Sequence, residues 1–142
     1  MKNLLLLLFA GMFTLTSCSK DDDDNNTTTA VAANLKSGTW RVSSFIDNGT
    51  DETTDFNGFT FTYNNGGTVS AVNNILTVTG SWSTGTDDSR AKLNLDFSSS
   101  SLSQFEELSE DWEIVSQSAT QVSLRHVSGG SGETDLLVFQ KN

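Results

Sequence analysis

The chain has 142 residues, of which 35 % are hydrophobic, and its 18 acidic residues outnumber its 8 basic ones to give a net charge of −10. This length suits one domain, and the negative charge argues against a nucleic-acid-binding protein, because such proteins carry a basic face. One cysteine and one histidine exclude an intrachain disulfide framework and a catalytic metal site built on two or three histidines.

The chain begins with a short apolar segment that is typical of a secretory signal. Lys2 supplies a positive charge, and residues 4–13 are almost continuously apolar. A run of about ten residues is half the length that spans a bilayer. We therefore interpret residues 1–17 as a signal peptide and leave them out of the fold.

The residues that follow resemble the lipobox of bacterial lipoproteins. Residues 15–18 read Leu-Thr-Ser-Cys; the resemblance implies cleavage before Cys18 and acylation of that cysteine, and two or three acyl chains anchor a protein stably. Ser19, in place of an aspartate, resembles an outer-membrane sorting signal. The next residues form an acidic run that resembles the surface-export signal of some lipoproteins, with a solvated spacer as the alternative: Lys20, Asp21, Asp22, Asp23 and Asp24.

Residues 18–33 are predicted to form a disordered acidic tether. Residues 21–29 include no apolar side chain and so offer nothing that can pack. Like charges repel one another and extend such a segment. The folded domain is therefore expected over residues 34–142, held away from the membrane.

From residue 39 onward, apolar and polar residues alternate with the period of half-buried strands. The expected strands cover residues 39–47, 58–64, 68–73, 75–83, 90–97, 111–116, 120–127 and 133–141. The Gly- and Asn-rich links between them predict tight turns and antiparallel neighbours. Leu102, Phe105 and Leu108 recur at helical spacing and predict one short helix between strands five and six.

Eight antiparallel strands with one apolar face favour an all-β fold, an eight-stranded up-and-down barrel whose closure removes exposed edges. A two-sheet β-sandwich is the alternative. The alternation in the first strand places Trp40, Val42, Ser44 and Ile46 on its inner face. The run of apolar residues in the last strand leaves its facing ambiguous.

The first strand opens with Gly38-Thr39-Trp40, which resembles the G-x-W motif of lipocalins. In that family the tryptophan closes the barrel floor beneath a basic residue near the last strand. The resemblance thus implies a floor made by Gly38, Trp40 and Lys141. A cation over an indole face contributes about 0.5–2 kcal/mol.

The end of the barrel opposite Trp40 is expected to form a mouth that carries the two longest connections, residues 47–57 and 98–110. Its carboxylates would disfavour anionic ligands, or simply keep the protein soluble: Asp47, Asp51, Glu52, Asp55, Glu106, Glu107, Glu110, Asp111 and Glu133. Among them Asp51, Glu52 and Asp55 are calcium candidates, although their spacing matches no EF-hand. No other metal and no cofactor is expected.

Large inward side chains raise the question of a ligand pocket. The candidate lining residues are Phe59, Phe61, Tyr63, Trp82, Leu95, Phe97 and Trp112. They either surround a small apolar or amphipathic ligand or fill the barrel completely. His126 is a candidate general base with Asp111 or Glu133, but no nucleophile motif accompanies it and no enzyme is expected.

Two functions therefore remain. In the first, the protein is an outer-membrane lipoprotein, displayed at the cell surface, whose barrel binds a small apolar ligand. In the second, the barrel is filled and its loops dock an envelope protein or a glycan.

Overall fold

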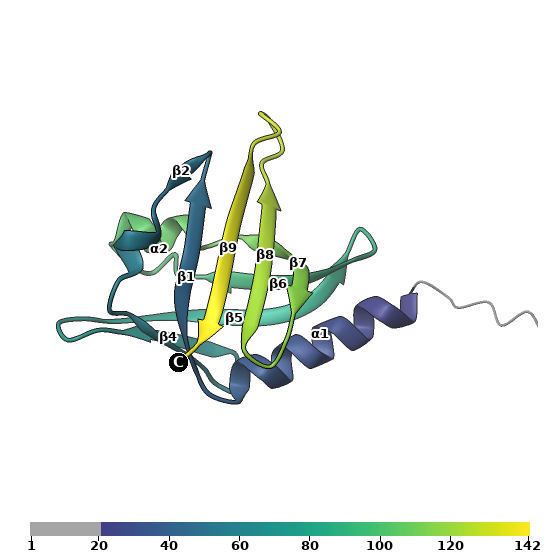
Figure 1. The fold of residues 1–142 in the computed structure, drawn as a ribbon, viewed down its shortest axis with the longest axis horizontal. Coiled ribbons are helices and arrows are strands. Elements are labelled where there is room, and N and C mark those ends of the chain that lie inside the picture. The colour runs from purple at the N-terminus through teal and green to yellow at the C-terminus, as the bar shows by residue number, and fades with distance from the viewer. Residues whose placement is uncertain (1–20) are drawn as a thin grey trace, which may run out of the picture.

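Eight strands follow one another around a closed antiparallel barrel in the computed structural model, which describes residues 21–142 (Figure 1). They are β1 (Thr39–Asp47), β3 (Thr60–Tyr63), β4 (Thr68–Val72), β5 (Thr77–Asp87), β6 (Arg90–Asp96), β7 (Asp111–Gln117), β8 (Gln121–Val127) and β9 (Thr134–Lys141). Each strand pairs with the next, and β9 pairs back with β1. A two-residue strand, β2 (Thr50–Asp51), extends the hairpin after β1. The predicted up-and-down barrel is confirmed and the sandwich is excluded.

Between residues 21 and 142, three helical segments accompany the strands. The predicted short helix is α2 (Ser103–Glu107), between the fifth and sixth barrel strands. The sequence did not predict α1 (Asp21–Lys36) or the 3₁₀ turn η1 (Thr53–Phe56) between β2 and β3. In the part of the chain that the structure describes, no helix is both long and apolar enough to cross a membrane.

Helix α1 corrects the predicted tether. Val31 and Leu35 are completely buried in the same core as the barrel residues. They lie four residues apart and so share one helix face, which packs against β5 and β6. The Asn34 side-chain amide donates to Gln117 Oε1 at 2.7 Å, which fixes the end of the helix to β7. From Asp21 onward the segment is thus helical, and the folded part begins before residue 34.

A β-bulge corrects the predicted facing of β1. The β1–β9 register shifts between Val42 and Ser44. One extra residue in a strand moves every later side chain to the opposite face. Phe45, at 1 % exposure, therefore enters the core in place of Ser44 and Ile46.

The ambiguous last strand has a single facing in the structure. Asp135, Leu137 and Phe139 are buried, whereas Leu136 is exposed. The inward residues of β3, β5 and β6 follow the predicted alternation.

Candidate functional site

The floor has the geometry implied by the G-x-W resemblance. Lys141 Nζ lies 5.6 Å from the centre of the Trp40 ring and donates to Ser37 Oγ at 2.9 Å. The indole N–H of Trp40 donates to the Leu35 carbonyl at 3.0 Å, so α1 closes the floor from below. A Cβ at Gly38 would lie 2.6 Å from Lys141 Cε. The glycine thus leaves space for the lysine side chain to reach the indole.

Aromatic rings fill the barrel interior. Every residue of the predicted pocket is buried, at 9 % exposure or less: Phe59, Phe61, Tyr63, Trp82, Leu95, Phe97 and Trp112. Phe105, from α2, inserts among four other phenylalanine rings, with centroid distances between 5.1 and 6.2 Å: Phe56, Phe59, Phe61 and Phe97. These residues are core, and α2 plugs the barrel at its mouth.

Four rings of this core were not among the predicted pocket residues: Phe45, Phe56, Phe105 and Phe139. Phe45 is inward because of the bulge, and Phe56 and Phe105 come from connections rather than strands. The helical spacing around Phe105 was the one signal that could have placed a ring over the mouth.

Tyr63 carries a polar group into the barrel interior. Its hydroxyl is buried without a hydrogen-bond partner among the described residues, and burial raises the pKa of the phenol well above its usual value. Its ring packs edge-on against Trp82 and Phe139. A buried hydroxyl without a partner lowers the stability of the folded chain.

The mouth is acidic, as predicted, but its carboxylates meet in a different set. Carboxylate oxygens of Glu52, Asp47 and Glu107 lie within 4.8 Å of one another. Glu52 therefore groups with these two residues and not with the other calcium candidates, Asp51 and Asp55. Partial desolvation, a hydrogen bond with Glu52, and the charges of Glu52, Asp47 and Asp55 raise the pKa of the largely exposed Glu107 carboxyl to about 7. Asp51 instead accepts hydrogen bonds from Thr53, at 3.0 Å from its N–H and 2.6 Å from its hydroxyl, which lower the pKa of Asp51.

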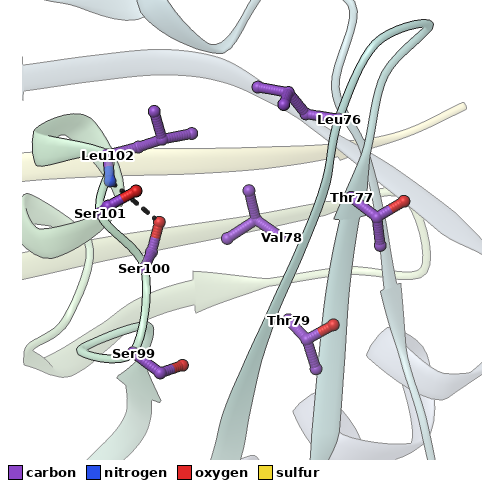
Figure 2. Close-up of a pocket in the computed structure, with 8 residues that line it drawn as sticks. All are labelled: Leu76, Thr77, Val78, Thr79, Ser99, Ser100, Ser101 and Leu102. Carbon is purple, nitrogen blue, oxygen red and sulfur yellow. Dashed lines mark hydrogen bonds between the residues drawn. The ribbon is translucent and has the colours of Figure 1, made fainter.

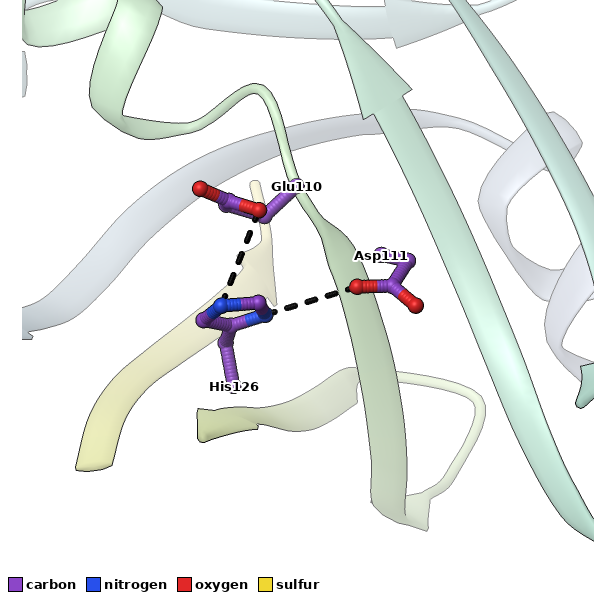
Figure 3. Close-up of side chains that lie close together, drawn as sticks. All are labelled: Glu110, Asp111 and His126. Carbon is purple, nitrogen blue, oxygen red and sulfur yellow. Dashed lines mark ion pairs between the residues drawn. The ribbon is translucent and has the colours of Figure 1, made fainter. Parts of the chain in front are cut away.

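His126 lies between two carboxylates at the same end of the barrel (Figure 3). Its Nδ1 is 3.5 Å from Asp111 Oδ1 and its Nε2 is 3.6 Å from Glu110 Oε2. The predicted neighbour Asp111 is therefore present, whereas Glu110 takes the place proposed for Glu133. Neither distance reaches the roughly 3.2 Å that a general base needs in hydrogen-bond contact.

A groove opens in the barrel wall beside the start of β5 (Figure 2). It has a volume of about 400 Å³ and is lined by Leu76, Thr77, Val78, Thr79, Ser99, Ser100, Ser101 and Leu102. A second hollow of about 360 Å³ continues along β5 and shares Thr79 and Ser99 with the first. We call these two hollows together the β5 groove. Sequence reasoning missed it, since its serines and threonines have the same pattern as any solvated loop and strand face.

The fold and the floor together define a lipocalin-like barrel. No protein-family model and no curated protein matches the chain. Among solved structures, the fold is similar to that of a DUF4847 family protein from Bacteroides vulgatus ATCC 8482. The TM-score is 0.52 and the sequence identity 19 %, over 79 % of this chain and 97 % of that chain, a likeness of fold alone.

Proposed function

We propose that this protein is an interaction module whose filled barrel docks an extended polypeptide segment of a partner in the β5 groove. The observation that carries the proposal is a half-paired strand. The β4–β5 ladder runs as far as Val72↔Thr77, whereas the β5–β6 ladder stops at Ser81↔Asp96. The first residues of β5 are thus paired on one side only, and alternate main-chain groups face the groove.

A half-paired strand is a template for another strand. An added strand gains affinity from main-chain hydrogen bonds and specificity from pockets for alternate side chains. In the groove, Leu76, Val78 and Leu102 supply the apolar pocket, and Figure 2 shows them around one hollow. Serine and threonine hydroxyls line the rest. The expected partner segment therefore alternates apolar and small polar residues.

The surface chemistry favours a peptide over a glycan. Every aromatic side chain between residues 24 and 142 is buried, so the groove presents no ring on which a sugar could stack. The interior also counts against an internal ligand, because Phe105 and its neighbouring rings occupy it.

A small amphipathic molecule in the same groove is the second candidate. A volume of about 400 Å³ lies in the range of small-molecule sites. Three apolar side chains and several hydroxyls would match such a molecule.

The proposal includes anchoring through an acylated Cys18 at the outer membrane, with display at the cell surface. The lipobox-like residues support it, although they lie outside the described residues. The β4–β5 hairpin, which borders the groove, projects on the side of the barrel away from the start of α1 (Figure 1). A chain held near residue 18 would thus present the groove away from the lipid. Cys18→Ser is expected to release the protein from the membrane fraction, and retention there would contradict the anchor.

Photo-cross-linking in the native host tests the groove. Benzoylphenylalanine is placed at Leu76, which is 42 % exposed, or at Val115, a control on β7 that is 58 % exposed. We expect a peptide adduct at residue 76 and none at residue 115, with the mass of the adduct identifying its class. A small-molecule adduct would select the second candidate, and equal labelling at both positions would overturn the groove as a site.

A further inference from the structure

We propose that Glu110, Asp111 and His126 bind a divalent transition-metal ion of the zinc class at the barrel mouth. These residues offer one imidazole nitrogen and two carboxylate oxygens, and the ligand atoms all lie within 4.8 Å of one another. The site is separate from the β5 groove and does not depend on the peptide-docking proposal.

The positions of the three residues follow from the sheet. Glu110 and Asp111 stand at the start of β7, and His126 lies near the end of the adjacent, antiparallel β8. The imidazole packs edge-on against Trp112, with ring centroids 6.0 Å apart. Trp112 is itself fully buried, and its indole N–H donates to the Leu108 carbonyl at 3.0 Å. The histidine is thus held by the core while the two carboxylates reach solvent.

The two carboxylates lie beside different ring nitrogens, Asp111 at Nδ1 and Glu110 at Nε2. The N···O distances of 3.5 and 3.6 Å exceed the roughly 2.7–3.2 Å of an N–H···O hydrogen bond. Adjacent ligands of a tetrahedral zinc ion lie roughly 3.4 Å apart, because Zn–N and Zn–O bonds are about 2.0–2.2 Å long. His126 Nε2 and Glu110 already have nearly this spacing. For an ion on Nε2, Asp111, whose side chain is 50 % exposed, completes the set by turning its carboxylate from Nδ1 toward the ion.

Lys92 supports this arrangement from the other side of Asp111. Its Nζ lies 3.7 Å from Oδ2, the oxygen that does not face His126. A lysine on Oδ2 leaves Oδ1 as the oxygen that turns toward the ion. Three protein ligands leave a coordination position open to water or to a group from outside.

The donor set selects the class of ion. Imidazole nitrogen is a ligand for zinc, copper and nickel, whereas calcium and magnesium take oxygen ligands. The side chain of His126 is 17 % exposed, so an ion reaches it directly from solvent. We therefore expect Zn²⁺ to bind and Ca²⁺ to leave the imidazole unaffected.

The test is a Zn²⁺ titration of the full chain, followed by calorimetry and by NMR of the imidazole. The chain has one histidine, so its imidazole signals are unambiguous. Saturable one-to-one binding that shifts these signals is expected. Glu110→Gln and Asp111→Asn should each weaken binding about tenfold or more, and His126→Gln should abolish it.

Asp87→Asn is the matched control, since it removes one charge from the β5–β6 hairpin at the opposite end of the barrel. It should leave zinc affinity unchanged. Zinc binding that survives His126→Gln, or that leaves the imidazole signals in place, would overturn the proposal and indicate an ion held by surface acids. Glu110→Gln and Asp111→Asn change exposed side chains and keep the test valid if His126→Gln does not fold. An equal response to Ca²⁺ would also contradict the proposed class.

Discussion

The two ends of the barrel solve the problem of closure by different means. At the floor, Lys141 lies over the Trp40 ring, and the indole N–H of Trp40 donates to the Leu35 carbonyl near the end of α1. At the mouth, α2 inserts Phe105 among other rings, while its Glu107 carboxyl lies against further acids. The floor thus combines complementary groups. The mouth is closed by apolar packing of Phe105, although repulsion among the nearby carboxylates opposes this closure.

The floor end of the barrel therefore contributes to stability, whereas the groups available for binding lie at the mouth end. The side chains of Trp40 and Lys141 at the floor have interaction partners within the chain, so they offer few free groups to a ligand. The mouth end holds the half-paired start of β5, the carboxylates and His126. Groups whose interactions are incomplete within the chain are the ones that a partner or an ion can satisfy, so both proposals fall at the mouth end.

The largest expected effect comes from removing the plug at the mouth. Phe105→Ala deletes a fully buried ring and leaves a cavity, and such changes cost about 3–5 kcal/mol. Urea denaturation measures the loss. Leu76→Ala, an exposed apolar residue at the same end, is the control and should change stability by less than about 0.5 kcal/mol. A similar small loss for Phe105→Ala would mean that α2 does not close the barrel.

The floor contact is tested by a double-mutant cycle. Lys141→Ala removes the cation over Trp40 and should cost about 0.5–2 kcal/mol. Gly38→Ala places a Cβ 2.6 Å from Lys141 Cε, which displaces the lysine and should cost a similar amount. In the Lys141→Ala background the same glycine change should cost little, because both substitutions remove one contact. Additive losses in thermal or urea unfolding would refute this account of Gly38.

The charge conflict at the mouth predicts a pH dependence. The pKa of Glu107 is about 7 in the folded chain, against an ordinary value of 4.5, so folding favours its protonated form. Its contribution to stability is therefore full below about pH 4.5 and is lost as the pH rises through about 7.

Glu107→Gln should accordingly raise stability at pH 8 and leave it unchanged at pH 4. The gain should stay below about 1 kcal/mol, since water screens an exposed group. Melting temperatures at the two pH values measure it. Glu106→Gln removes the same charge from the same helix, outside the cluster, and serves as the control. An equal gain for both variants at pH 8 would indicate general repulsion rather than the Glu52–Glu107 contact.

The smallest effect is expected at Tyr63. Tyr63→Phe removes a buried hydroxyl that has no partner in the described part of the chain, so stability should stay constant or rise by up to about 1 kcal/mol. Urea denaturation again gives the answer. A loss of more than 1 kcal/mol would show that the hydroxyl makes a stabilising hydrogen bond.

Much of the fold was predictable because strand periodicity is a local property. The alternation around Phe61, the turn residues and the G-x-W tripeptide predicted the strands, their order and the floor. The bulge after Val42 was not predictable, because a one-residue register shift depends on pairing with β9. Helix α1 was missed because its buried apolar face includes only two large residues, Val31 and Leu35. These residues follow an acidic run whose composition indicates disorder.

The candidate site was predicted less completely for the same reason. The acidic mouth follows from strand order, and so does the approach of His126 to Asp111. Whether the inward rings surround a cavity depends on Phe105, which enters from a connection. The half-paired edge of β5 arises because the pairing with β6 ends at Ser81 and Asp96. The end of this pairing depends on the assembled barrel and cannot be predicted from either strand alone.

The central claim, that the barrel is filled and its binding surface lies outside, is tested most directly by methyl NMR of the full chain under xenon. Xenon enters apolar cavities. The methyl signals of Leu93, Leu124 and Leu137, all core residues, should stay in place in the unaltered chain. Those nearest the vacated ring should shift in Phe105→Ala, which shows that the probe reports a cavity. Xenon-dependent shifts of the core leucines in the unaltered chain would reveal an internal cavity and contradict the account.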